Sequence, residues 1–103
     1  KNLKLEYLYA ESNNKIYDVN HMAETLIELD CRYTSIDQNG IKDLKKLQKL
    51  YAEDNINIKD VNHLANTLIV LNCSYRCGIT QEGIENLKVL KYLDSDDNEK
   101  INN

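Results

Sequence analysis

The residues best able to do chemistry in this 103-residue chain are three cysteines, Cys31, Cys73 and Cys77. Cys31 and Cys73 end closely similar segments 42 residues apart. If these segments are strands two places apart in a sheet, their Cα atoms lie roughly 10 Å apart, whereas a disulfide needs less than about 7 Å. We therefore predict buried free thiols at these two positions and an exposed Cys77 in a loop. An unpaired set of three fits a reducing compartment such as the cytoplasm.

Metal binding has weak support in the sequence. His21 and His63 are also 42 residues apart, and we expect turn residues whose rings bond to neighbouring backbone groups. The chain has no Cys-x-x-Cys or His-x₃-His spacing, so zinc is not predicted. The acidic run Asp94–Glu99 begins like a calcium loop, but Glu99 stands where that loop requires glycine. We predict no metal site.

Catalysis is not indicated either. Glu28 and Asp30 share one face of a predicted strand, but such neighbours do not by themselves form an acid/base pair. The sequence places no serine or cysteine beside a histidine base, and its three glycines form no phosphate-binding loop. We therefore expect a protein that is not an enzyme and needs no cofactor.

Internal repetition is the feature that should position all of these residues. Residues 8–33 align with residues 50–75 at 17 identities in 26 positions, and each 42-residue period divides into two halves of about 21. Each half reads Leu-x-x-Leu-x-small, followed by two residues and often Asn. The units start, at steps of 21, 21, 21 and 22, with Leu5, Leu26, Leu47, Leu68 and Leu90.

This pattern resembles the leucine-rich repeat family, whose units read Leu-x-x-Leu-x-Leu-x-x-Asn/Cys with a period of 20–29 residues. The resemblance covers nearly the whole chain. It departs from the family at the sixth position, which is Ala, Cys or Ser, and at the ninth, which is Thr34 and Arg76 in the even units. The resemblance implies an α/β solenoid with parallel strands, in one domain over residues 1–103.

The residues between the predicted strands differ between odd and even units. Apolar residues three apart, such as Ile16, Val19 and Met22, favour 3₁₀ or irregular turns in odd units. In even units, Ile41-x-x-Leu44 and Ile84-x-x-Leu87 predict one short helix each. The predicted N-caps of these helices are Asp37 and Thr80.

Composition narrows the partners and the setting. The net charge is −4 without a basic stripe, which argues against nucleic acid, and no apolar run approaches the 18 residues of a membrane span. The abundance of Asn, Lys, Ile and Tyr resembles the asparagine-rich repeat proteins of amoeba-infecting giant viruses or AT-rich protists. We expect a cytoplasmic protein, with host cytoplasm or a virion as the setting if its origin is viral.

The two ends of the chain lack polar capping repeats, which such arrays need for solubility. We expect a fragment of a longer array, or self-association through the uncapped ends. The apolar residues expected to lie open at the two ends are Leu3, Leu5, Leu8, Leu90, Leu93 and Ile101.

Function is predicted to lie on the concave face of the parallel sheet. Tyrosines among carboxylates are typical of recognition surfaces, although cross-strand packing could also explain them. Because the face is acidic, a basic or polar protein partner is favoured. We predict a protein-interaction module, with a unit that stacks end to end or coats a particle as the alternative. The predicted binding residues are Tyr7, Tyr9, Glu28, Asp30, Lys49, Tyr51, Asn72, Tyr92 and Asp94.

Overall fold

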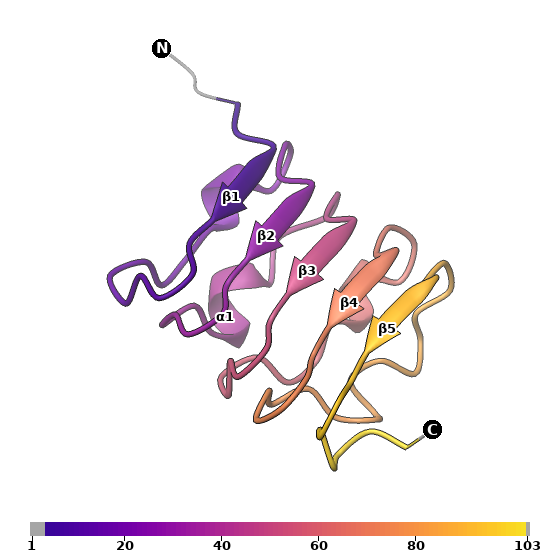
Figure 1. Ribbon diagram of the computed structural model, residues 1–103. Helices are drawn as coiled ribbons and strands as arrows, with labels where there is room; N and C mark the ends of the chain where they lie inside the picture. The colour runs from indigo at the N-terminus through magenta and orange to yellow at the C-terminus, as the bar shows by residue number, and fades with distance from the viewer. Residues whose placement is uncertain (1–3, 103) are drawn as a thin grey trace.

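Five three-residue strands form one all-parallel sheet in the order β1-β2-β3-β4-β5 (Figure 1). The computed structural model describes residues 4–102. The strands are β1 Tyr7–Tyr9, β2 Glu28–Asp30, β3 Lys49–Tyr51, β4 Val70–Asn72 and β5 Tyr92–Asp94. Their register pairs equivalent positions of successive units, so the predicted parallel sheet is confirmed.

The alternation of inward and outward side chains along each strand explains which residues form the core. The central leucine of each strand points inward, and Leu29, Leu50 and Leu71 are completely buried. The small residues two positions further on, such as Cys31 and Ala52, are also completely buried. The terminal strands have a neighbour on one side only, so the central leucine of β1 is half-buried and that of β5 is 40% exposed.

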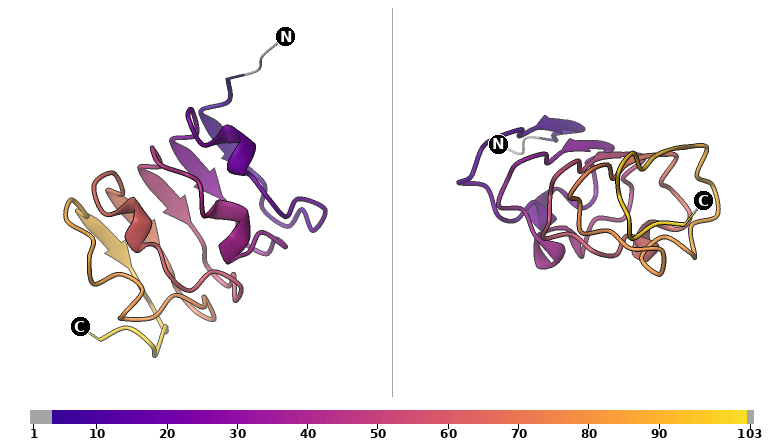
Figure 2. Two further views of the ribbon diagram at one scale, coloured as in Figure 1. Left: turned by 180° about the vertical axis from the view of Figure 1, so that it is seen from behind. Right: turned by 60° about the horizontal axis from the view of Figure 1, so that its bottom comes forward.

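The segments between strands all run behind the sheet and leave its other face open (Figures 1 and 2). They hold the 3₁₀ helices η1 Asn20–Met22 and η2 Asn62–Leu64, as predicted for the odd units, and the helix α1 Gln38–Ile41. Asp37 caps α1 by accepting a bond from the Gly40 N–H at 2.9 Å. Within residues 4–102 no helix is long and apolar enough to span a membrane.

The second predicted helix, around Ile84 and Leu87, is wrong. This stretch forms turns whose backbone bonds join residues three apart, such as Leu87 N–H to the Ile84 carbonyl at 3.1 Å. A continuous α-helix needs bonds between residues four apart. Thr80 still makes the bond expected of a cap residue, since its hydroxyl accepts from the Gly83 N–H at 3.1 Å, but no helix follows it.

The repeated Asp-Val-Asn-His motif connects neighbouring return segments. Asn20 donates to the Asn39 carbonyl at 2.8 Å and accepts from the Asp43 N–H at 2.8 Å. Asn62 makes the equivalent pair of bonds one period later, to Glu82 and Asn86. The ring of His63 lies 3.0 Å from the Ile41 carbonyl, which confirms its predicted role as a turn residue bonded to backbone.

A second asparagine, at the ninth position of odd units, binds the preceding unit from within the core. Asn55 is 1% exposed and donates to the carbonyls of Cys31 and Ile36 at 3.0 and 3.1 Å. Asn98 makes the same two bonds, to Cys73 and Ile79, at 2.8 and 3.1 Å. In the second unit, Thr34 bonds locally to the Cys31 carbonyl instead, so the side-chain amides bridge alternate junctions.

The prediction of an exposed Cys77 is wrong, since Cys77 is completely buried like Cys31 and Cys73. The extra residue of the fourth unit turns Arg76 outward, and its side chain is 84% exposed. Cys77 then takes the inward place that Thr34 has in the second unit, although it lies five residues after the end of β4 and Thr34 only four after the end of β2. The extra residue is therefore accommodated at the surface, and buried side chains recur one residue later than in the second unit.

The ends are only partly open. Leu3 lies outside the described residues, and Leu5, Leu8 and Leu90 are half-buried. Ile101 was expected to be exposed but is 7% exposed, because it packs on the core cluster. The turn that carries Ile101 is closed by its own N–H, which donates to the Asn98 carbonyl at 3.3 Å.

Candidate protein-binding face

The open face is the side of the sheet opposite the return segments, and the register places the predicted binding residues on it in two rows. One row across the strands is Tyr7, Glu28, Lys49, Val70 and Tyr92; the other is Tyr9, Asp30, Tyr51, Asn72 and Asp94. Tyr7, Tyr9 and Tyr92 are 55%, 62% and 66% exposed. Tyr51, on the central strand, is half-buried.

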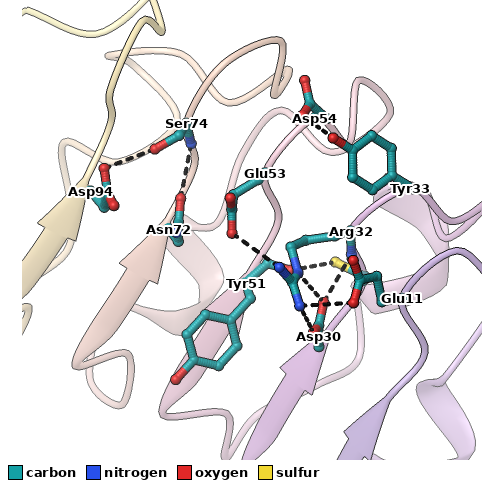
Figure 3. Close-up of polar contacts among 11 residues, drawn as sticks. Glu11, Asp30, Arg32, Tyr33, Tyr51, Glu53, Asp54, Asn72, Ser74 and Asp94 are labelled. Carbon is teal, nitrogen blue, oxygen red and sulfur yellow. Dashed lines mark hydrogen bonds and ion pairs between the residues drawn. The ribbon is translucent and has the colours of Figure 1, made fainter.

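Asp30 differs from the prediction of an exposed contact residue, because it is only 5% exposed. Arg32 lies over it and bonds to both of its oxygens, at 2.9 and 2.7 Å (Figure 3). The same guanidinium reaches Glu11 at 3.0 Å and Glu53 at 3.7 Å. Asp30 therefore holds Arg32 in place instead of presenting its own carboxylate to a partner.

Arg32 joins three strands through this cluster. Glu11 follows β1, Asp30 ends β2 and Glu53 follows β3. The hydrogen bonds that Arg32 donates to Asp30 raise the pKa of Arg32 above its ordinary value, and the charges of Glu11 and Glu53 act in the same direction. The guanidinium thus remains charged and neutralises part of the acidity over β1 and β2.

Two exposed tyrosines are fixed by carboxylates of the next repeat unit. Tyr9 donates its hydroxyl to Glu28 at 2.9 Å, and Tyr33 donates to Asp54 at 2.7 Å. These hydrogen bonds, as the largest cause, raise the pKa of both phenols above 10.0. The rings are therefore presented in a set orientation, which lowers the entropy lost when a partner binds.

Sequence reasoning missed a further row, at the eighth position of each unit. All five residues there have left-handed backbone conformations, with φ between 55° and 65°: Ser12, Tyr33, Asp54, Tyr75 and Asp97. Each of these residues lies three positions after the end of its strand, where the chain turns behind the sheet. The recurrence of Tyr and Asp at this position is visible in the sequence, but strand-like alternation predicts outward side chains only at the third, fifth and seventh positions.

A groove of about 430 Å³ lies on the open face over β3, β4 and β5. Val70 and Asn72 on β4 lie between Tyr51 of β3 and Tyr92 of β5, with Lys91 and Asp94 also lining it. Asp94 is fixed by the Ser74 hydroxyl, which donates to it at 2.9 Å (Figure 3). The groove thus combines two aromatic rings, the aliphatic side chain of Val70, one lysine and one oriented carboxylate.

The described residues give little support to nucleophilic catalysis by a thiol or to metal binding. Burial raises the pKa of all three thiols, that of Cys73 to about 12, so they are weak nucleophiles near neutrality. No group of three or more His, Cys, Asp or Glu side chains within residues 4–102 is arranged to hold a metal ion.

Comparison of the chain with models of protein families, with curated proteins and with solved structures gives no match in any of the three.

Proposed function

We propose that this chain is a leucine-rich-repeat solenoid that acts as a protein–protein interaction module through its open face. The observation that carries the proposal is the exposure of Tyr7, Tyr9 and Tyr92, at 55–66%, on a sheet whose other face is packed on leucines. Tyr offers a large contact area for few rotatable bonds, which makes it a common binding hot spot. A cytoplasmic setting suits the three unpaired thiols.

Stabilising packing between tyrosines is the competing explanation of this row. Tyr9 bonds to a side chain on the neighbouring strand, as such packing requires. However, the hydroxyl bond leaves 62% of Tyr9 exposed. Tyr92 lies on the last strand, where it has a neighbour on one side only. A purely structural role would therefore leave most of these ring surfaces unused.

Selection from a displayed library of random peptides tests the proposal, since the partner need not be known. Tyr9→Ala and Tyr92→Ala should each weaken the selected binders by about tenfold. Tyr17→Ala is the matched control, because Tyr17 is 63% exposed but lies in a return segment. Binders that tolerate both face variants, or whose amide-shift footprint lies on the return segments, would refute the proposal.

End-to-end assembly is the second candidate, and the ends of the sheet favour it. Leu93 is 40% exposed on the last strand. At the other end, Leu8, Ile16, Val19 and Met22 line an open groove of about 410 Å³. A head-to-tail contact of this kind produces rings where the rotation between copies closes and open filaments where it does not. Sedimentation over a concentration series distinguishes the candidates, since a constant monomer mass excludes assembly by this chain alone.

A further inference from the structure

The acidic charge of the open face is concentrated where the strands end. Fifteen residues occupy the fifth, seventh and eighth positions of the five units, and we call them the acidic strip. Seven of them are Asp or Glu and one is Arg, so the strip has a formal charge of −6, against −4 for the whole chain. Its members are Tyr9, Glu11, Ser12, Asp30, Arg32, Tyr33, Tyr51, Glu53, Asp54, Asn72, Ser74, Tyr75, Asp94, Asp96 and Asp97.

The unneutralised part of this strip lies over β3, β4 and β5. Over β1 and β2, Arg32 already pairs with Asp30 and Glu11. The nine strip positions of the last three units contain five carboxylates and no basic residue, and of these five Arg32 reaches Glu53 at 3.7 Å. Arg76, just beyond the strip, approaches Asp54 only to 3.9 Å and its side chain is 84% exposed. A partner would therefore meet net negative charge at the same strands that carry the groove.

The groove has the parts that bind a basic side chain. Tyr51 and Tyr92 offer aromatic faces on opposite sides of β4, and a guanidinium or ammonium group binds favourably over such a ring. Val70 lies between them, where the aliphatic stem of Arg or Lys would contact it. Asp94 supplies a carboxylate, with the Ser74 hydroxyl fixing its orientation.

Lysines at the opposite rim set the direction of binding. Lys49 and Lys91 lie at or just before the start of β3 and β5, so the face is basic at one edge and acidic at the other. A basic side chain entering the groove is repelled at the first edge and attracted at the second. A nucleic acid would be repelled by the five carboxylates.

We propose that this groove binds an Arg or Lys side chain of a partner protein, presented by a basic extended segment that lies along the acidic strip. This inference rests on the proposed function, because it specifies the chemistry of the partner for the same face. The segment crosses β3, β4 and β5 with its basic side chains directed towards the carboxyl ends of the strands.

The test uses a nine-residue fluorescent peptide of alternating Arg and Ser, with a Glu-Ser peptide of equal length as its counterpart. The Arg peptide should bind, shift amides of β3–β5 and weaken steeply with salt. The Glu peptide should not bind. Equal binding of the two peptides, no binding of the Arg peptide, or a footprint away from these strands would each overturn the inference.

Charge variants of opposite sign separate groove binding from general attraction. Asp94→Asn should weaken the Arg peptide about two- to fivefold, and Lys91→Gln should strengthen it by a similar factor. Glu85→Gln is the control, since Glu85 is an exposed carboxylate of a return segment. Tyr92→Ala should cost about tenfold. Equal effects of Asp94→Asn and Glu85→Gln would overturn the assignment of this groove.

The two proposals fail in different ways. If library binders map to the open face but contain few basic residues and ignore Asp94→Asn, the groove assignment is overturned while the interaction face stands. If the binders map elsewhere, the proposed function itself fails.

Discussion

The buried asparagines offer the sharpest test of how the units hold one another. Asn55→Ala removes three hydrogen bonds, namely two donated to the Cys31 and Ile36 carbonyls and one accepted from the Asn57 N–H. The Cys31 carbonyl keeps the bond from Thr34, whereas the Ile36 carbonyl loses its amide donor in a buried place. At about 1 kcal/mol for each bond, with more for a buried group left unpaired, the variant should lose about 2–4 kcal/mol.

The chain contains its own matched control for this substitution. Asn13 holds the same position in the first unit but is exposed, and its side chain accepts one bond, from the Lys15 N–H at 2.9 Å. Asn13→Ala should therefore cost about 0.5–1 kcal/mol. Urea denaturation monitored by circular dichroism gives both values, with an unchanged slope as the check on two-state behaviour. Equal losses for the two variants would refute the bridging role of the buried amide.

Four further predictions concern the core, the arginine cluster and the thiols. Leu50→Ala should lower the free energy of unfolding by about 2–5 kcal/mol, because it leaves a central cavity. Tyr51→Ala should lower it less in the same denaturation assay, and equal losses would contradict the assignment of Leu50 as inward and Tyr51 as outward. Arg32→Ala should cost about 1–3 kcal/mol because it leaves the 5%-exposed Asp30 without its cation, and an Asp30→Asn background should reduce that loss in a double-mutant cycle. All three thiols should react slowly with a thiol reagent at pH 8 until the protein is denatured, and a fast native thiol would contradict their burial. Because burial raises the pKa of Cys73 from 9.0 to about 12, the native state should lose stability as pH rises above 9, and Cys73→Ala should reduce that loss in denaturation measured at successive pH values.

The sequence predicted the parallel sheet and its register because both follow from the repeat. A fixed period returns each strand to the same place, so equivalent leucines must stack. The odd-unit turns and the Asp37 cap were also predictable, since each depends on a few neighbouring residues. The turns around Ile84 were mistaken for a helix, because one apolar pair fits both an α-helical turn and successive three-residue turns.

Errors arose where one residue changes the local geometry. The insertion before Cys77 marked a loop correctly, but a loop residue is exposed only if its side chain points outward. The one-residue increase in the length of the fourth unit does not determine whether the side chain of Arg76 or that of Cys77 points outward. The physical reason for the outcome is that a cysteine can be buried cheaply, whereas a charged arginine cannot be buried without a partner.

At the candidate site, too, the sequence pattern predicted the position of a residue but not its exposure. The alternation of inward and outward side chains correctly predicted that Asp30 lies on the open face. It could not predict that Arg32, two residues later, folds back and covers the Asp30 carboxylate. Arg32 can reach Asp30, Glu11 and Glu53 together because parallel strands bring the ends of three units to one edge. The fourth unit has Asn72 and Ser74 at the positions of Asp30 and Arg32, so it lacks this cation. These two differences between otherwise similar units leave the carboxylates of the fifth unit without an arginine beside them, and they are why we place the basic partner over β3–β5 and not over β1 and β2.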